Sequence, residues 1–70
     1  METNEKQVSN NIKALIKKYG LTSYIVADRM HLSRATISSI INRPFKYDVN
    51  RLNDVAHAIG CDINEFFMPL

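Results

Sequence analysis

The chain has 70 residues, which is enough for one compact domain and too few for two. Its hydrophobic content of 46% and charged content of 23% are ordinary for a globular protein and exclude a disordered chain. No apolar run is long enough for a transmembrane helix or a secretory signal, and a single cysteine, Cys61, excludes an internal disulfide. We therefore expect a small, reduced, cytoplasmic domain.

Charge is divided unevenly along the chain. Residues 1–51 carry nine basic and four acidic residues, a charge of +5, whereas residues 52–70 carry three acidic residues and no basic one. A protein that turns one positive face toward a polyanion shows this polarity. Charge alone leaves a simpler interpretation open, in which a solvated surface is asymmetric by chance.

Apolar residues at helical spacing predict a first helix over residues 4–19. Gly20 follows it and supplies the left-handed residue that commonly ends a helix. The predicted apolar face of this first helix consists of Val8, Ile12, Leu15, Ile16 and Tyr19.

The next two predicted helices are short and span residues 22–30 and 33–42. Thr22 or Ser23 caps the earlier one, and Ser33 caps the later one. Pro44 disfavours helical backbone at Arg43 and therefore ends the later helix. The predicted apolar faces are Ile25, Val26, Ala27 and Met30 in the earlier helix, and Ile37, Ile40 and Ile41 in the later one.

Two further helices are predicted after Tyr47. Asp48 caps a helix over residues 48–59, which Gly60 ends. Asp62 and Glu65 resemble a capping box for a fifth helix over residues 62–67. Since no segment alternates between apolar and polar residues as a strand does, the sequence predicts an all-α fold. The buried face of the fourth helix is Leu52, Val55, Ala56 and Ile59.

The second and third predicted helices have the spacing of a helix-turn-helix, which places its second helix in the major groove of DNA. The outward face of that helix holds the small or polar Ala35, Ser38 and Ser39, together with Arg34. An arginine can donate two hydrogen bonds to a guanine. The polar face of an ordinary amphipathic helix gives the same pattern, because a pair of helices does not by itself imply DNA.

Two runs of the sequence resemble the lambda-repressor-like family, which includes the phage repressors and the Cro proteins. The run LTSYIVADRMHLSRATISSIINR (residues 21–43) resembles the helix-turn-helix of this family, and LNDVAHAIGCDINEFF (residues 52–67) resembles its fourth and fifth helices. Together with the first helix, the resemblance covers nearly the whole chain. It implies a compact five-helix DNA-binding domain with the helix-turn-helix at about residues 22–42.

The resemblance also implies roles for individual residues. The third helix is the recognition helix of the family, with Arg34, Ala35 and Ser39 at positions that usually touch bases and Ser38 beside them. The positions that meet DNA phosphates are occupied by Thr22, Ser23, Asn42, Arg43 and Lys46.

Two residues depart from the pattern of the family. Ser23 stands where Gln is common, and its shorter side chain puts that phosphate contact in doubt. His31 stands where the turn usually has Gly, at a position that needs left-handed backbone. We expect the turn to tolerate His31 at some cost in strain; the alternative is that His31 distorts the turn and weakens DNA binding.

Other candidates for chemistry are weak. His57 and Cys61 are four residues apart, but Gly60 intervenes and no third metal ligand is nearby. A chain of this size also leaves little room for a substrate pocket. We therefore expect no catalytic residue, no metal site, no cofactor and no enzymatic activity.

The C-terminus is unusually apolar. In one interpretation Phe66 or Phe67 closes the core and the remaining residues fray. In the other, Phe66, Phe67, Met68 and Leu70 form the interface of a homodimer or a contact with another protein. A dimer would match operators with two half-sites about 34 Å apart.

Two classes of function follow. The first is a sequence-specific transcriptional regulator, a Cro-like protein or small phage-type repressor, which acts by occupying a double-stranded DNA operator. The second is a modulator that binds another protein on the same scaffold, either a phage repressor as a heterodimer or the toxin of a toxin–antitoxin pair. Charge reversal at Arg34 and Arg43 separates the two classes, because only the DNA-binding function needs those cations.

Overall fold

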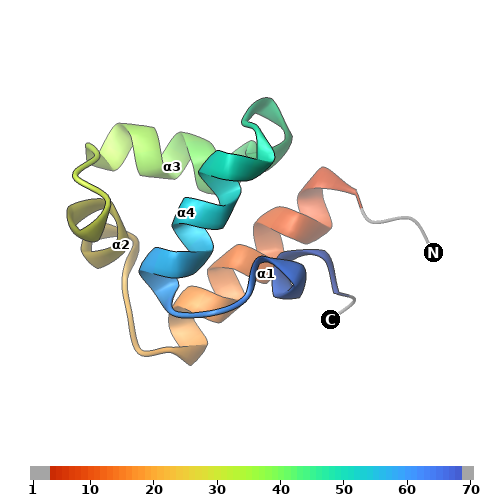
Figure 1. Ribbon diagram of the computed structural model, residues 1–70, viewed down its shortest axis with the longest axis horizontal. Coiled ribbons are helices and arrows are strands. Elements are labelled where there is room, and N and C mark those ends of the chain that lie inside the picture. The colour runs from red at the N-terminus through yellow and green to blue at the C-terminus, as the bar shows by residue number, and fades with distance from the viewer. Residues whose placement is uncertain (1–3, 69–70) are drawn as a thin grey trace.

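The computed structural model describes residues 4–68, and all regular secondary structure in that range is helical. Four α-helices and two short 3₁₀-helices follow one another (Figure 1). They are α1 (Glu5–Lys18), α2 (Ser23–Arg29), α3 (Arg34–Asn42), η1 (Pro44–Lys46), α4 (Val49–Ile59) and η2 (Ile63–Phe67). No helix within the described residues has the length and apolarity needed to cross a membrane.

Polar side chains begin the four α-helices, because each satisfies a backbone N–H that the first turn leaves without a partner. Thr22, and not Ser23, caps α2 by accepting from the Ile25 N–H at 3.3 Å. Ser33 caps α3 and Asp48 caps α4, as predicted. Asn4 caps α1.

The glycine positions confirm the predicted helix ends. Gly20 follows α1 with φ +71°, and Gly60 caps α4 with φ +97°. Both values lie in the left-handed region that residues with a Cβ avoid.

The prediction of a fifth helix is right in place but wrong in the type of helix. Asp62 and Glu65 form the predicted capping box, but the segment winds as the 3₁₀-helix η2. Met68 ends it in extended backbone, with φ −82° and ψ 146°, as is usual for a residue that precedes a proline. Only five residues remain between cap and stop, a length at which 3₁₀ winding is common. η1 was not predicted; it is a single turn that starts at Pro44, directly after α3.

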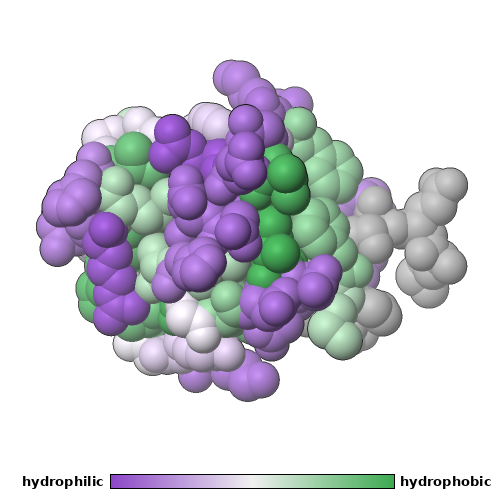
Figure 2. Space-filling view, viewed as in Figure 1, coloured by the Kyte–Doolittle hydropathy of each residue, from purple (hydrophilic) through white to green (hydrophobic). Residues whose placement is uncertain are grey.

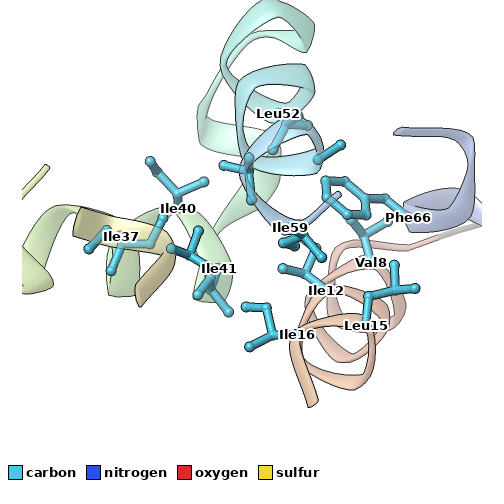
Figure 3. Close-up of a cluster of buried hydrophobic side chains, with 14 residues drawn as sticks. Val8, Ile12, Leu15, Ile16, Ile37, Ile40, Ile41, Leu52, Ile59 and Phe66 are labelled. Atoms are coloured by element: carbon cyan, nitrogen blue, oxygen red, sulfur yellow. The ribbon is translucent and has the colours of Figure 1, made fainter. Parts of the chain in front are cut away.

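Five of the six helices, α1 to α4 and η2, contribute to one hydrophobic core. α1 contacts both α3 and η2, whereas α4 lies between α2 and η2 (Figure 1). Figure 3 shows the ring of Phe66 beside Val8 and Ile59, with the isoleucines of α3 on the opposite side of the same cluster. The buried apolar residues are Val8, Ile12, Leu15, Ile16, Val26, Ala27, Ile37, Ile40, Ile41, Leu52, Val55, Ala56, Ile59 and Phe66, with Pro44 also fully buried.

Two predicted core residues are exposed instead. Tyr19 is 41% exposed because α1 ends at Lys18 and Tyr19 is its C-cap. Ile25 is 40% exposed on α2, where Val26 and Ala27 supply the buried face. The core therefore receives less from α2 than the sequence predicted.

Candidate nucleic-acid interface

α2 and α3 are joined by a tight turn that is held by backbone hydrogen bonds. The Leu32 N–H donates to the Ala27 carbonyl at 2.9 Å, and the His31 N–H donates to the Asp28 carbonyl at 3.1 Å. His31 has φ +56°, and among the described residues no other residue besides glycine has a positive φ. The prediction of a left-handed His31 is confirmed, and the turn forms around it. Ala27 is 3% exposed, which confirms its predicted place on the buried face of α2.

The outward face of α3 carries small and polar side chains. Ala35 and Ser38 are exposed, whereas Ser39 is partly buried. The Tyr47 hydroxyl donates to Ser39 Oγ at 2.9 Å and covers that end of the face. Ser39 therefore keeps its own O–H as a donor but has lost one acceptor site to Tyr47.

Asn42, at the end of α3, is held against its own helix. Its Nδ2 group donates to the Ser38 carbonyl at 2.9 Å and to Ser38 Oγ at 3.2 Å. The amide carbonyl of Asn42 accepts no hydrogen bond among these contacts. The sequence could indicate the i to i+4 proximity of these two residues, but not that both belong to one local network.

Arg34, the first residue of α3, lies against an aromatic ring of α2. Its guanidinium carbon is 4.0 Å from the centroid of the Tyr24 ring. Tyr24 is 56% exposed, so the pair lies at the surface where the two helices of the motif begin. Tyr24 is not one of the site residues predicted from the sequence.

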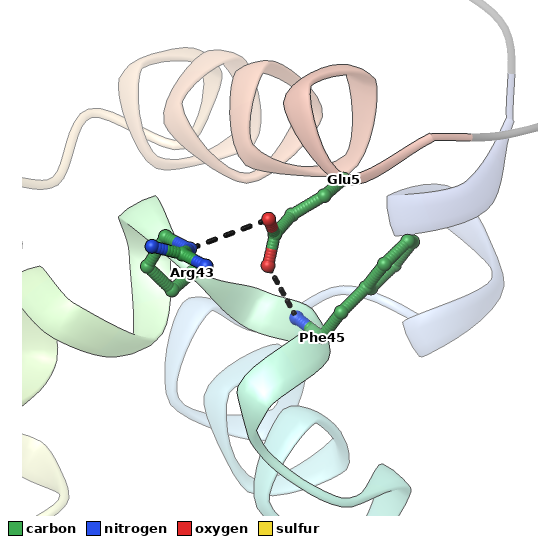
Figure 4. Close-up of polar contacts among 3 residues, drawn as sticks. All are labelled: Glu5, Arg43 and Phe45. Carbon is green, nitrogen blue, oxygen red and sulfur yellow. Dashed lines mark hydrogen bonds and ion pairs between the residues drawn. The ribbon is translucent and has the colours of Figure 1, made fainter.

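Arg43 and the backbone of η1 share one acidic partner from α1 (Figure 4). Glu5 Oε1 lies 3.3 Å from Arg43 Nε, and Glu5 Oε2 accepts the Phe45 N–H at 3.2 Å. The Arg43 side chain is 69% exposed despite this ion pair. Glu5 therefore ties the segment after α3 to the first turn of α1, and Lys46 lies exposed on the same segment.

A hollow of about 290 Å³ lies where α1, the start of α2 and the end of α3 meet. Ile16 and Ile41 are buried residues in its lining, whereas Lys13 and Asn42 are exposed. Ser23 and Ser38 complete the lining. Lys13 is a cation beside two of the predicted phosphate-contacting residues, Ser23 and Asn42.

The apolar C-terminus is divided by the fold. Phe66 is fully buried, so its assignment to a protein–protein interface is wrong; it closes the core. Phe67 and Met68 are 37% and 57% exposed. Leu70 lies outside the described residues. The buried Asn11 side chain holds this segment, because its Nδ2 group donates to the Phe66 and Met68 carbonyls at 2.8 and 2.6 Å.

The remaining titratable groups offer little reactivity. No cluster of three or more His, Cys, Asp or Glu side chains able to hold a metal ion occurs among residues 4–68. Burial raises the pKa of the Cys61 thiol, and the carboxylates of Glu65 and Asp62 raise it further. The thiol is therefore neutral near pH 7, and it is the thiolate that acts as a nucleophile.

Comparison with known proteins gives one family. A family model described as the Cro/C1-type HTH DNA-binding domain matches residues 11–68, which is most of the chain. No curated protein and no solved structure gives a significant match. The matched range includes the whole of α2, α3, η1, α4 and η2.

Proposed function

Because the chain belongs to the Cro/C1-type helix-turn-helix DNA-binding family, we propose that it is a sequence-specific transcriptional regulator that acts by occupying its operator. One observation carries the proposal. The outward face of α3 combines Arg34 with the small exposed side chains of Ala35 and Ser38, on a helix whose other face is buried. Such a helix can approach base edges closely.

Base reading is assigned to Arg34, Ala35, Ser38 and Ser39. Arg34 pairs with a guanine through two hydrogen bonds, and Ala35 packs on a thymine methyl. Ser39 has the smallest part, because the Tyr47 hydroxyl already occupies its oxygen.

Phosphate contacts are assigned to the two borders of that face. Thr22 and Ser23 lie before it at the start of α2, and Asn42, Arg43 and Lys46 follow it. The hollow beside Ser23 supports adding Lys13, whose ammonium balances a phosphate where the short Ser23 cannot brace one. These contacts fix the orientation of the protein on the duplex and carry no sequence information directly.

We also propose that the protein binds DNA as a homodimer. Four exposed apolar side chains belong to η1, the start of α4 and the end of the described chain, and Figure 2 shows apolar surface gathered on that side of the molecule. We name this set the apolar patch: Phe45, Val49, Phe67 and Met68. Val49→Lys and Met68→Lys should shift a concentration-dependent dimer to monomer in analytical ultracentrifugation. A wild-type protein that is monomeric at every concentration, with and without DNA, would contradict this part of the proposal.

The same patch supports the second candidate function, a modulator that binds another regulator or a toxin. The two candidates differ in what they require of Arg34 and Arg43. Replacing both with Glu abolishes operator binding but leaves the binding of a protein partner intact if the partner is captured by the patch. A regulator acting on DNA works in the cytoplasm of a bacterial cell, and this location is part of the proposal.

Two alanine variants test the operator-binding function, with an operator obtained by selecting sites from a randomised duplex library. Arg34→Ala should weaken binding to the selected site by about 1–3 kcal/mol and relax the preference at one base pair. Lys46→Ala should weaken binding to all sequences alike and lower the slope of log K against log salt by about one unit. If Arg34→Ala binds the selected site as the wild type does, the base-reading assignment is wrong.

A further inference from the structure

Tyr24 and Arg34 form a contact between the two helices of the motif that the family assignment does not explain. The guanidinium carbon lies 4.0 Å from the centre of the phenol ring, well within the distance of about 6 Å at which a cation and a ring face attract. Tyr24 is in the first turn of α2, and Arg34 begins α3. The ring is more than half exposed, so the core does not require an aromatic residue at position 24.

Stacking leaves a guanidinium able to bind a base. The ring covers one flat face of the group, whereas all five N–H bonds lie in the plane of the guanidinium and point outward from its edge. The two acceptors of guanine in the major groove require that edge. A stacked Arg34 therefore keeps its recognition chemistry while its position is restricted.

The restriction matters because arginine is long and flexible. An unrestrained arginine loses the freedom of several rotatable bonds when it meets a base, and this loss weakens binding. The Tyr24 ring removes part of that freedom before DNA arrives. The gain applies only where Arg34 makes its hydrogen bonds, so it acts on the correct base pair and not on the others.

We propose that Tyr24 is a specificity-determining positioning residue, whose ring holds the Arg34 guanidinium ready for a guanine in the major groove. This inference rests on the proposed function. Tyr24 acts through Arg34 and does not itself read a base. A different role, in which the Tyr24 hydroxyl donates to a DNA phosphate, predicts another pattern of effects and is distinguished by the experiment.

The experiment measures affinity on a panel of duplexes. The wild-type protein first selects its site from a randomised library, and every base pair of that site is then substituted singly. Fluorescence anisotropy gives the affinity of the wild type, Arg34→Ala, Tyr24→Leu, Tyr24→Phe and the double variant Tyr24→Leu/Arg34→Ala for each duplex. Thermal unfolding by circular dichroism checks that the variants fold.

We expect Tyr24→Leu to reduce discrimination by about two- to fivefold, and only at the base pair that Arg34→Ala relaxes. Tyr24→Phe keeps the ring and should discriminate as the wild type does. In the Arg34→Ala background, Tyr24→Leu should change nothing further, since the group that it positions is gone.

Three results would overturn the inference. In the first, Tyr24→Leu lowers the affinity for all duplexes equally. In the second, Tyr24→Phe reduces discrimination as much as Tyr24→Leu does, which assigns the role to the hydroxyl. In the third, Tyr24→Leu has the same effect with and without Arg34. Failure of the proposed function is recognised separately and earlier, because a wild-type protein that selects no sequence refutes operator binding, and this inference with it, before any variant is measured.

Discussion

The Asn11 side chain joins α1 to the C-terminal segment, and its removal tests how that segment is held. Asn11 is 1% exposed, and its Nδ2 group donates to the carbonyls of Phe66 and Met68. Its Oδ1 atom is buried and accepts no hydrogen bond. The amide therefore acts only as a donor. Its two hydrogen bonds hold the backbone at the end of η2, where the Phe66 and Met68 carbonyls accept them.

The expected cost of Asn11→Ala follows from these contacts. Losing the bond to the part-buried Met68 carbonyl costs about 1 kcal/mol, and leaving the buried Phe66 carbonyl without a donor costs about 1–3 kcal/mol. We expect a loss of about 2–4 kcal/mol in the free energy of unfolding. A domain of this size has a total of roughly 4–10 kcal/mol, so the variant should lose a large part of its stability.

Asn11→Asp is a sharper variant because it keeps the shape of the side chain. It replaces the two N–H donors with an oxygen that faces two carbonyl oxygens. Burial and this repulsion disfavour the charged form, so the pKa of the new carboxyl is raised in the folded protein above its unfolded value of about 3.9. Stability is then highest below pH 4 and is lost as pH rises through the folded pKa.

Urea unfolding followed by far-ultraviolet circular dichroism is the suitable assay, since the chain has no tryptophan. With a slope of about 1 kcal/mol per molar urea, Asn11→Ala should lower the midpoint by about 2 M or more. Asn10→Ala is the matched control, because Asn10 is exposed on the same helix and should change stability by less than about 0.5 kcal/mol. Equal midpoints for the Asn10 and Asn11 variants would refute the reasoning.

Three further predictions concern the turn, the thiol and the hollow. His31→Gly should stabilise the protein by up to about 1 kcal/mol, measured as a higher urea midpoint, because glycine relieves the positive φ of +56° at some cost in chain entropy; a loss of stability would mean that His31 makes compensating contacts. The pKa of Cys61 is raised above the ordinary 9.0, so the contribution of this thiol to stability should be constant below pH 9 and be lost above it, and Cys61→Ala should flatten the fall in that range; the same fall in both proteins would contradict this origin. Lys13→Ala should lower the salt slope of DNA binding by about one unit, whereas Lys18→Ala should not, because Lys18 is exposed on the same helix but does not line the hollow; equal slopes for both variants would remove Lys13 from the phosphate contacts.

The helix boundaries could be predicted because each is fixed by residues within one turn of it. The Ser33 hydroxyl accepts the Thr36 N–H at 3.1 Å, and Asp48 accepts the Arg51 N–H at 2.9 Å. Such contacts are local, and the sequence order is sufficient to indicate them. The left-handed backbone of His31 is indicated differently, by the resemblance to the lambda-repressor-like family, whose turn usually has Gly at that position.

Contacts between elements could not be predicted. Glu5 meets Arg43 only because α1 lies beside η1 in the folded chain, and Tyr47 meets Ser39 only because the chain reverses after α3. Composition gave no reason to single out Glu5 as the partner of Arg43. The physical reason is that each contact depends on how two helices pack.

Phe66 and Phe67 show the same difference between what local sequence can predict and what depends on packing. Two adjacent phenylalanines have equal hydrophobicity, and an α-helix or a 3₁₀-helix orients them differently. With 3₁₀ winding and the Asn11 bonds to its carbonyl, Phe66 is buried and its neighbour is partly exposed. The sequence could predict that one ring closes the core but not which one.

Operator binding is tested most directly by titrating the protein against DNA from the region upstream of its own gene. Fluorescence anisotropy, measured over a series of salt concentrations with and without competitor DNA, separates specific from non-specific binding. We predict saturable binding that survives excess competitor and weakens steeply as salt rises. Binding that competitor abolishes, or no binding at physiological salt, would contradict the account and leave the helix-turn-helix as a scaffold for another partner.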